Sequence, residues 1–100
     1  MRSRYCAYAV SLPLYIIKTT HPFNNDFMEN KNTWKQEILD FSSNFNFEKL
    51  TILEFIENVD ISYVTFTAKI SHNNSDHSFT EKSKFIQKEN RWLYLSGEQM

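Results

Sequence analysis

Glu81 is the residue whose neighbours most suggest chemistry. It alternates along an expected strand with Phe79, Ser83 and Phe85. These side chains therefore share one face of the strand, and the two phenylalanines indicate that this face points into the core. A carboxylate in such surroundings is desolvated, which raises its pKa unless a cation pairs with it. Arg4, in the N-terminal helical segment, is the candidate cation.

Three interpretations of Glu81 and Arg4 are open. The preferred one is a buried ion pair that orients the first helix on the sheet. The second is a charged pair inside a functional pocket. The third is a β-bulge that turns the Glu81 side chain toward solvent.

Four further residues complete the set of pocket candidates. Tyr8 would bring a hydroxyl group to the edge of a pocket, and a buried hydroxyl must find an acceptor. His21 precedes Pro22 and suits a hydrogen-bonded structural role better than catalysis. Trp92 and Tyr94 alternate inward on the last expected strand, where core packing is favoured over a platform for base stacking.

No residue pattern predicts a metal or a cofactor. His72 and His77 flank Asp76, but their spacing matches no zinc motif, and we expect them in a solvated turn. The only cysteine, Cys6, excludes an intrachain disulfide, and its apolar surroundings predict a small buried residue. With Gly97 as its only glycine, the chain cannot build a phosphate loop or a dinucleotide fingerprint.

The composition fits one domain without a strong charge. One hundred residues suffice for a single core, and 16% of them are aromatic, so rings must supply much of the buried area. The net charge of −1 gives no field that would attract nucleic acid. The longest apolar run, Leu12–Ile17, is too short to span a membrane. We therefore expect a soluble protein of a reducing compartment, the cytoplasm.

Helices are expected in the first half of the chain. An amphipathic stripe predicts the first helix, with Ser3 as its cap. The stripe comprises Tyr5, Tyr8, Ala9 and Leu12. Pro13 cannot lie inside that helix and begins a short second one, capped by Ser11. Thr33 and Gln36 form a capping box that starts a third helix, at about residues 33–44.

After Asn44 the apolar period changes to two, as in strands. We expect strands at residues 47–57, 60–71, 77–88 and 91–96. Asn90 would adopt the positive φ of a tight hairpin, where glycine is missing. Helices followed by an antiparallel meander predict an α+β domain, with three helices packed on one face of a curved sheet.

Four short motifs stand in a recognisable order along nearly the whole chain. They are Arg2-Ser3-Arg4-Tyr5 with Tyr8, Thr20-His21-Pro22, Glu81-Lys82-Ser83-Lys84-Phe85, and Arg91-Trp92-Leu93-Tyr94 with Gly97. Together they resemble the central domain of the YchJ-type bacterial proteins. The resemblance implies one domain over residues 1–100 with the nuclear-transport-factor-2-like fold, a cystatin-like cone with a pocket between sheet and helices. Relatives usually have arginine in place of Lys84 and glycine in place of Asn90.

The resemblance implies a fold rather than a reaction. Full-length relatives carry cysteine-rich SEC-C motifs beside this domain, but with only Cys6 this chain has none, so no zinc is expected. The leading hypothesis is a non-catalytic binding or interaction module, its partner a protein, a small ligand or a second copy docked on the sheet. Tyr63, Thr65 and Thr67 would then form an exposed face. The alternative is a ligand-binding protein or an enzyme of hydrolase or isomerase type that uses the cone.

Overall fold

A computed structural model describes residues 2–100 of the chain. Three helices come first: α1 (Arg2–Ala9), α2 (Pro13–Lys18) and α3 (Lys31–Asn44). Five strands follow: β1 (Asn46–Glu57), β2 (Ile61–His72), β3 (Ser75–Asp76), β4 (Phe79–Lys88) and β5 (Arg91–Gln99). This element order confirms the α+β class expected from the change in apolar period.

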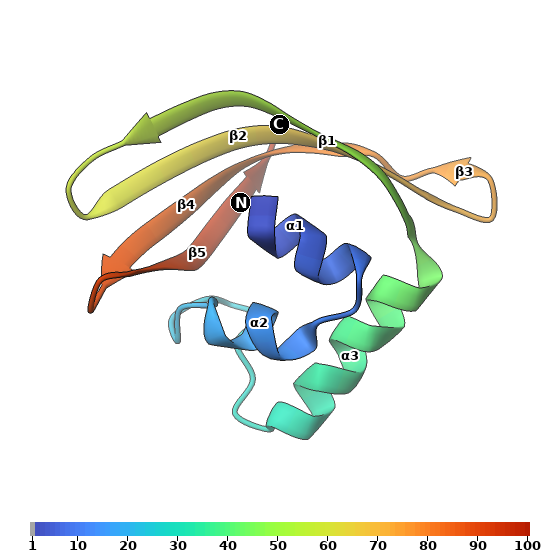
Figure 1. Ribbon diagram of the computed structural model, residues 1–100, viewed down its shortest axis with the longest axis horizontal. Coiled ribbons are helices and arrows are strands. Elements are labelled where there is room, and N and C mark those ends of the chain that lie inside the picture. Colours follow the sequence, from blue (N-terminus) through green and yellow to red (C-terminus); the bar gives the residue numbers. More distant parts are fainter. Residues whose placement is uncertain (1) are drawn as a thin grey trace.

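One antiparallel sheet carries the strands in the order β1-β2-β4-β5, with β3 paired to the end of β2. Figure 1 shows the sheet curving over the helices, which all lie on its concave side. The curvature has a local cause, because β-bulges interrupt the β1–β2 and β4–β5 pairings and a bulge bends its strand. Sheet and helices together form a cup.

The alternation of β2 makes the floor of this cup. Its buried residues recur at every second position: Ser62, Val64, Phe66, Ala68 and Ile70. Tyr63, Thr65 and Thr67 point to the opposite face and are half-buried there rather than exposed as predicted. The reason is cross-strand cover: Lys82 Nζ lies 5.0 Å from the Tyr63 ring centroid, and the Thr67 and Thr80 hydroxyls are 2.8 Å apart.

The buried face of α1 differs from the predicted stripe. Arg4 and Ala7 are its buried residues, whereas Ala9 and Leu12 are exposed. The helix ends at Ala9 and the chain then reverses, so Leu12 no longer follows the helical period. Cys6 is also exposed, and the prediction of a buried thiol was wrong.

The turn into α2 explains two further differences. Ser11 has a positive φ of 57° and does not cap α2, although Pro13 begins that helix as predicted. Ser3 lies within α1 instead of capping it, and its Oγ accepts a hydrogen bond of 2.6 Å from the Tyr15 hydroxyl. The two serines thus serve the junction between α1 and α2.

The third helix begins two residues earlier than predicted. Asn30 is its cap, since the Asn30 side chain accepts a hydrogen bond of 3.1 Å from the Thr33 backbone N–H. Thr33 therefore lies inside the first turn, and Gln36 donates to Asp40 rather than closing a capping box. In the last hairpin Asn90 has the predicted positive φ, at 64°.

Two separate groups of buried apolar residues stabilise the fold. The sheet cluster consists of Val64, Phe66, Ala68, Ile70 and Phe85. The helix cluster consists of Ala7, Ile16, Trp34 and Ile38. None of the helices within residues 2–100 is long and apolar enough to cross a membrane.

Candidate functional site

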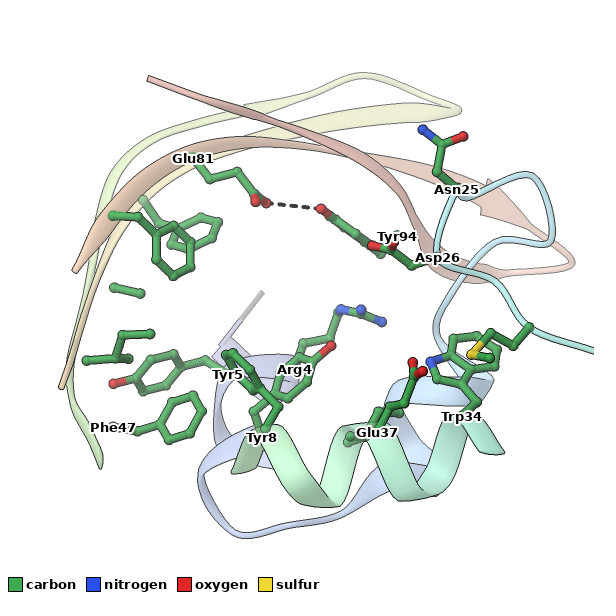
Figure 2. Close-up of a pocket in the computed structure, with 17 residues that line it drawn as sticks. Arg4, Tyr5, Tyr8, Asn25, Asp26, Trp34, Glu37, Phe47, Glu81 and Tyr94 are labelled. Carbon is green, nitrogen blue, oxygen red and sulfur yellow. Dashed lines mark hydrogen bonds between the residues drawn. The ribbon is translucent and has the colours of Figure 1, made fainter. Parts of the chain in front are cut away.

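A cavity of about 610 Å³ opens between the sheet cluster and the helix cluster. Such a volume lies within the range of small-molecule sites. Apolar side chains of the sheet line one wall, among them Phe47, Phe66, Ala68 and Phe79, and α3 contributes Trp34, Ile38 and Phe41. Figure 2 shows polar groups entering this space from several elements: Arg4, Tyr8, Asp26, Glu37, Glu81 and Tyr94.

Arg4 is fixed at one side of the cavity by the end of α2. Its Nη1 donates to the Ile16 carbonyl at 3.3 Å and to the hydroxyls of Thr19 and Thr20 at 2.6 and 3.2 Å. A helix C-terminus carries a partial negative charge and attracts a cation. The guanidinium carbon lies 4.7 Å from the centroid of the Tyr94 ring, a cation–π contact.

Burial has a clear electrostatic consequence for Arg4. The residue is only 6% exposed, and desolvation lowers its pKa, with nearby tyrosines opposing that effect. Tyr94 lies between the guanidinium and the Glu81 carboxylate, whose charge also opposes the lowering of the Arg4 pKa. Because an arginine side chain keeps its proton in proteins, the cavity wall holds a cation whose acidic neighbour, Glu81, is reached only through Tyr94.

Glu81 lies on the sheet side of the same cavity and is satisfied by neutral donors. Its Oε2 accepts hydrogen bonds from Ser83 Oγ at 2.5 Å and from the Tyr94 hydroxyl at 3.1 Å. Burial, followed by the charge of Glu81, raises the pKa of Tyr94. The phenol therefore stays protonated and remains a hydrogen-bond donor to the carboxylate.

Gly97 makes room for this arrangement. It lies opposite Ser83 in the β4–β5 register. A Cβ atom at this position would come within 2.5 Å of Glu81 Oε2 and of the Tyr94 hydroxyl oxygen. Glycine within a strand often marks such a close approach, so the single glycine of the chain is a signal that sequence reasoning could have used for the site.

The predicted ion pair between Arg4 and Glu81 is not formed. Tyr94 lies between the two charges, with its ring against the guanidinium and its hydroxyl on the carboxylate. The prediction failed because Thr19 and Thr20 bind one edge of the guanidinium. The bulge in the β4–β5 pairing falls beyond Lys84 and does not turn Glu81 outward, so the solvent-facing alternative is also wrong.

Comparison with known proteins places the chain in a family. A sequence model described as the middle NTF2-like domain of YchJ matches residues 1–97. The chain belongs to this family. The family and the NTF2-like α+β fold inferred from the short motifs are thereby confirmed, and the boundary at residue 100 stays a prediction.

Solved structures resemble this YchJ-type domain closely. A SEC-C motif-containing protein from Rhodopseudomonas palustris is 28% identical with a TM-score of 0.83, over 100% of this chain and 75% of that one. One from Psychrobacter arcticus is 24% identical with a TM-score of 0.76, over 96% of this chain and 56% of that one. A DUF4783 family protein from Bacteroides ovatus shares the fold at 12% identity, with a TM-score of 0.63 over 95% of this chain and 88% of that one.

Of the six pocket candidates, the YchJ-type fold brings four to the cavity: Arg4, Tyr8, Glu81 and Tyr94. Burial raises the pKa of Tyr8, and the neighbouring Arg4 opposes that rise. Sequence reasoning did not find Asp26 and Glu37, which lie exposed at the cavity, because nothing in their local pattern sets them apart from other surface acids.

His21 and Trp92 lie elsewhere. The His21 N–H donates to the Tyr94 carbonyl at 2.8 Å, and its Nδ1 accepts from the Phe23 N–H at 3.0 Å, which joins the loop after α2 to β5. Trp92 lies two residues nearer the β4–β5 hairpin than Tyr94. It packs on the sheet cluster and lines a second cavity of about 400 Å³.

The histidines near β3 serve the structure. His72 Nδ1 lies 2.5 Å from the Asn44 carbonyl oxygen, and the His72 and His77 rings are 6.1 Å apart. Within residues 2–100, no group of three His, Cys, Asp or Glu side chains could hold a metal ion.

Proposed function

We propose that this YchJ-type domain is a non-catalytic binding module for a small, largely apolar molecule with one polar group. The observation that carries the proposal is the cavity of about 610 Å³, which combines an aromatic wall with a few convergent polar side chains. The proposal joins the binding module expected from the sequence with the small-ligand alternative.

Contacts between aromatic rings fix the side chains of the aromatic wall. The Tyr5 and Phe47 rings meet edge to face at 5.6 Å, and the Phe66 and Phe79 rings at 6.0 Å. Edge-to-face pairs stabilise each other in place. These rings therefore lie along the wall, and a preformed wall lowers the entropic cost of binding.

The polar groups suit recognition better than catalysis. Arg4 and Tyr94 are donors, and Glu81 is an acceptor. General acid–base chemistry needs a base within reach of the substrate proton. Among the described residues that line the cavity there is no histidine or cysteine, and Glu81 Oε2 already accepts two hydroxyl donors. An enzyme would have to rely on the remaining oxygen of Glu81 or on the exposed carboxylates of Asp26 and Glu37.

Blocking the cavity tests the proposal. The probe is N-phenyl-1-naphthylamine, a neutral dye whose fluorescence rises in apolar surroundings. Ala68 lies on the cavity floor, so Ala68→Trp should weaken dye binding about tenfold or more, which corresponds to about 1.4 kcal/mol. Thr65→Trp, on the other face of the same strand, is the control and should bind as the native chain does. Dye binding by Ala68→Trp that equals the native chain, or none by the native chain, would refute the proposal.

A second candidate function is self-association, favoured by apolar residues at one end of the edge strand β1. Phe55 and Val59 are 59% and 84% exposed, and Leu53 beside them is also exposed. A patch of this kind is typical of contact sites. Sedimentation over a range of concentrations checks it: a second copy should bind there and Phe55→Ser should abolish the dimer, whereas a monomer at every concentration excludes it.

We also propose a cytoplasmic location. The exposed thiol of Cys6 would stay free in a reducing compartment. Fractionation of cells that express the protein tests this, and recovery from an oxidising compartment would contradict it.

A further inference from the structure

We propose, building on the proposed function, that the polar group of the ligand is a single carboxylate and that Arg4 binds it. The preferred ligand is then a monocarboxylic acid with an aromatic or branched apolar body. The inference rests on the state of Arg4 and on how the acids of the cavity are disposed.

Arg4 is a buried cation that its protein surroundings satisfy only in part. Tyr94 separates it from the Glu81 carboxylate, whose charge is among the smaller influences on Arg4. The Ile16 carbonyl, two threonine hydroxyls and a tyrosine ring supply only partial negative charge. A buried charge without a counter-ion is unfavourable, and an anion in the adjoining cavity would relieve that cost.

The side of the guanidinium that faces the cavity has the right shape for a carboxylate. The hydrogen bonds of Arg4 to the end of α2 all use Nη1. The Tyr8 hydroxyl is a further hydrogen-bonding neighbour of the guanidinium, and Figure 2 shows the guanidinium entering the cavity. The N–H groups of Nε and Nη2 form a planar fork that matches both oxygens of a carboxylate.

The acids of the cavity favour a monoanion over a more highly charged ligand. Glu81 lies across Tyr94 from Arg4 and accepts a hydrogen bond from the Tyr94 hydroxyl. Asp26 and Glu37 line the cavity from exposed positions at its mouth. Three carboxylates around one arginine would repel the second charge of a dicarboxylate or a phosphate. A single negative charge on the ligand can still bind at Arg4.

The position of Arg4 also directs the rest of the ligand. The opposite wall is the sheet face of Phe66, Ala68 and Phe79. A molecule whose carboxylate meets Arg4 must therefore place its remaining atoms against these apolar side chains. A flat or branched hydrocarbon body suits such a surface, since burying apolar area stabilises the complex.

Three related probes test the inference on the native chain by calorimetric titration at neutral pH. They are 2-naphthoate, its neutral isostere 2-naphthamide, and naphthalene-2,6-dicarboxylate. We expect 2-naphthoate to bind about tenfold or more tighter than either of the others. Equal binding of naphthoate and naphthamide would overturn the role of the carboxylate, and tighter binding of the dicarboxylate would overturn the preference for one charge.

Substitution of Arg4 gives the second test. Arg4→Met should bind 2-naphthoate no better than 2-naphthamide, and Arg4→Lys should keep part of the difference. Arg2→Met, an exposed position on the same helix, removes the same charge and should behave as the native chain does. Native-like naphthoate binding by Arg4→Met would overturn the inference. Failure of the proposed function is distinguishable, because the neutral dye would then not bind the native chain either.

Discussion

The sheet cluster and the helix cluster are equally buried, yet they are buried in different ways. Ile16 of the helix cluster is 1% exposed and Ile70 of the sheet cluster is 4% exposed. Ile16 is enclosed by packed helices, whereas Ile70 is one of the residues that line the cavity. Low exposure therefore records shielding from bulk water and does not establish close packing on every side.

Helix α1 holds the two clusters apart. Its Tyr5 packs against the sheet cluster, while Ala7 and Tyr8 belong with the helix cluster. Arg4, on the same helix, is bound to the end of α2 and stacked on Tyr94 of β5. Arg4 thus links α1 both to the end of α2 and to β5, beside the cavity.

Matched isoleucine substitutions test this difference between the clusters and should give the largest effect. Ile16→Ala should lower the free energy of unfolding by about 4 kcal/mol, because the deletion opens a new void in a packed region. Ile70→Ala should lower it by only about 2 kcal/mol, because the lost atoms faced a cavity that already exists. Urea unfolding of both variants measures the two values.

The comparison between the clusters depends on which substitution, Ile16→Ala or Ile70→Ala, lowers the free energy of unfolding more. Equal losses would show that the cavity wall is packed as tightly as the helix cluster. A larger loss for Ile70→Ala would reverse the comparison. Thr65→Ala, on the other face of β2, is the control for a general weakening of that strand.

The second prediction concerns the sheet side of the cavity. Gly97→Ala should lower the free energy of unfolding by about 1–3 kcal/mol, because its Cβ would meet the Glu81 carboxylate and the Tyr94 hydroxyl. In a Glu81→Ala background, Gly97→Ala should lower the free energy of unfolding by about 1 kcal/mol less, because the Glu81 carboxylate no longer meets the new Cβ. Urea unfolding of the four chains gives this coupling energy.

An identical cost of Gly97→Ala in both backgrounds would contradict the close contact with Glu81. Ser96→Ala is the control, because it alters an exposed neighbour on the same strand and should change stability by less than about 0.5 kcal/mol.

Much of the fold follows from local patterns in the sequence. Apolar alternation gave β2 to within one residue, and the lack of glycine in the last hairpin predicted the positive φ of Asn90. Local patterns decide less well between equivalent caps. Asn30 and Thr33 both suit the start of a helix, and only the path of the preceding loop selects Asn30.

The site was less predictable, because its contacts join distant parts of the chain. The motif residues Arg4 and Glu81 do face one cavity. The partners of Arg4 come from the end of α2, where Thr19 and Thr20 bind the guanidinium. No periodic pattern in the sequence predicts this contact. The general rule that buried charges pair predicted an ion pair, whereas the fold separates the charges by Tyr94.

The smallest predicted effect is a pH dependence that again separates the two sides of the cavity. On the sheet side, burial and the charge of Glu81 both raise the pKa of Tyr94. On the helix side, burial raises the pKa of Tyr8, but Arg4 opposes the rise. A tyrosine in the unfolded chain loses its proton near pH 10, so below that pH both states keep the proton and the contribution of Tyr94 to stability is fully present.

Above about pH 10 the folded state holds more protons than the unfolded state, and stability falls as pH rises. Urea unfolding between about pH 8 and pH 11 should therefore show a shallower decline for Tyr94→Phe than for the native chain. Tyr8→Phe is the matched variant and should flatten the decline less, because Arg4 favours the ionised form of Tyr8. If the free energy of unfolding declines equally with pH in the native chain and in Tyr94→Phe, the phenol of Tyr94 is well hydrated. The sheet side of the cavity would then differ from the helix side only in shape.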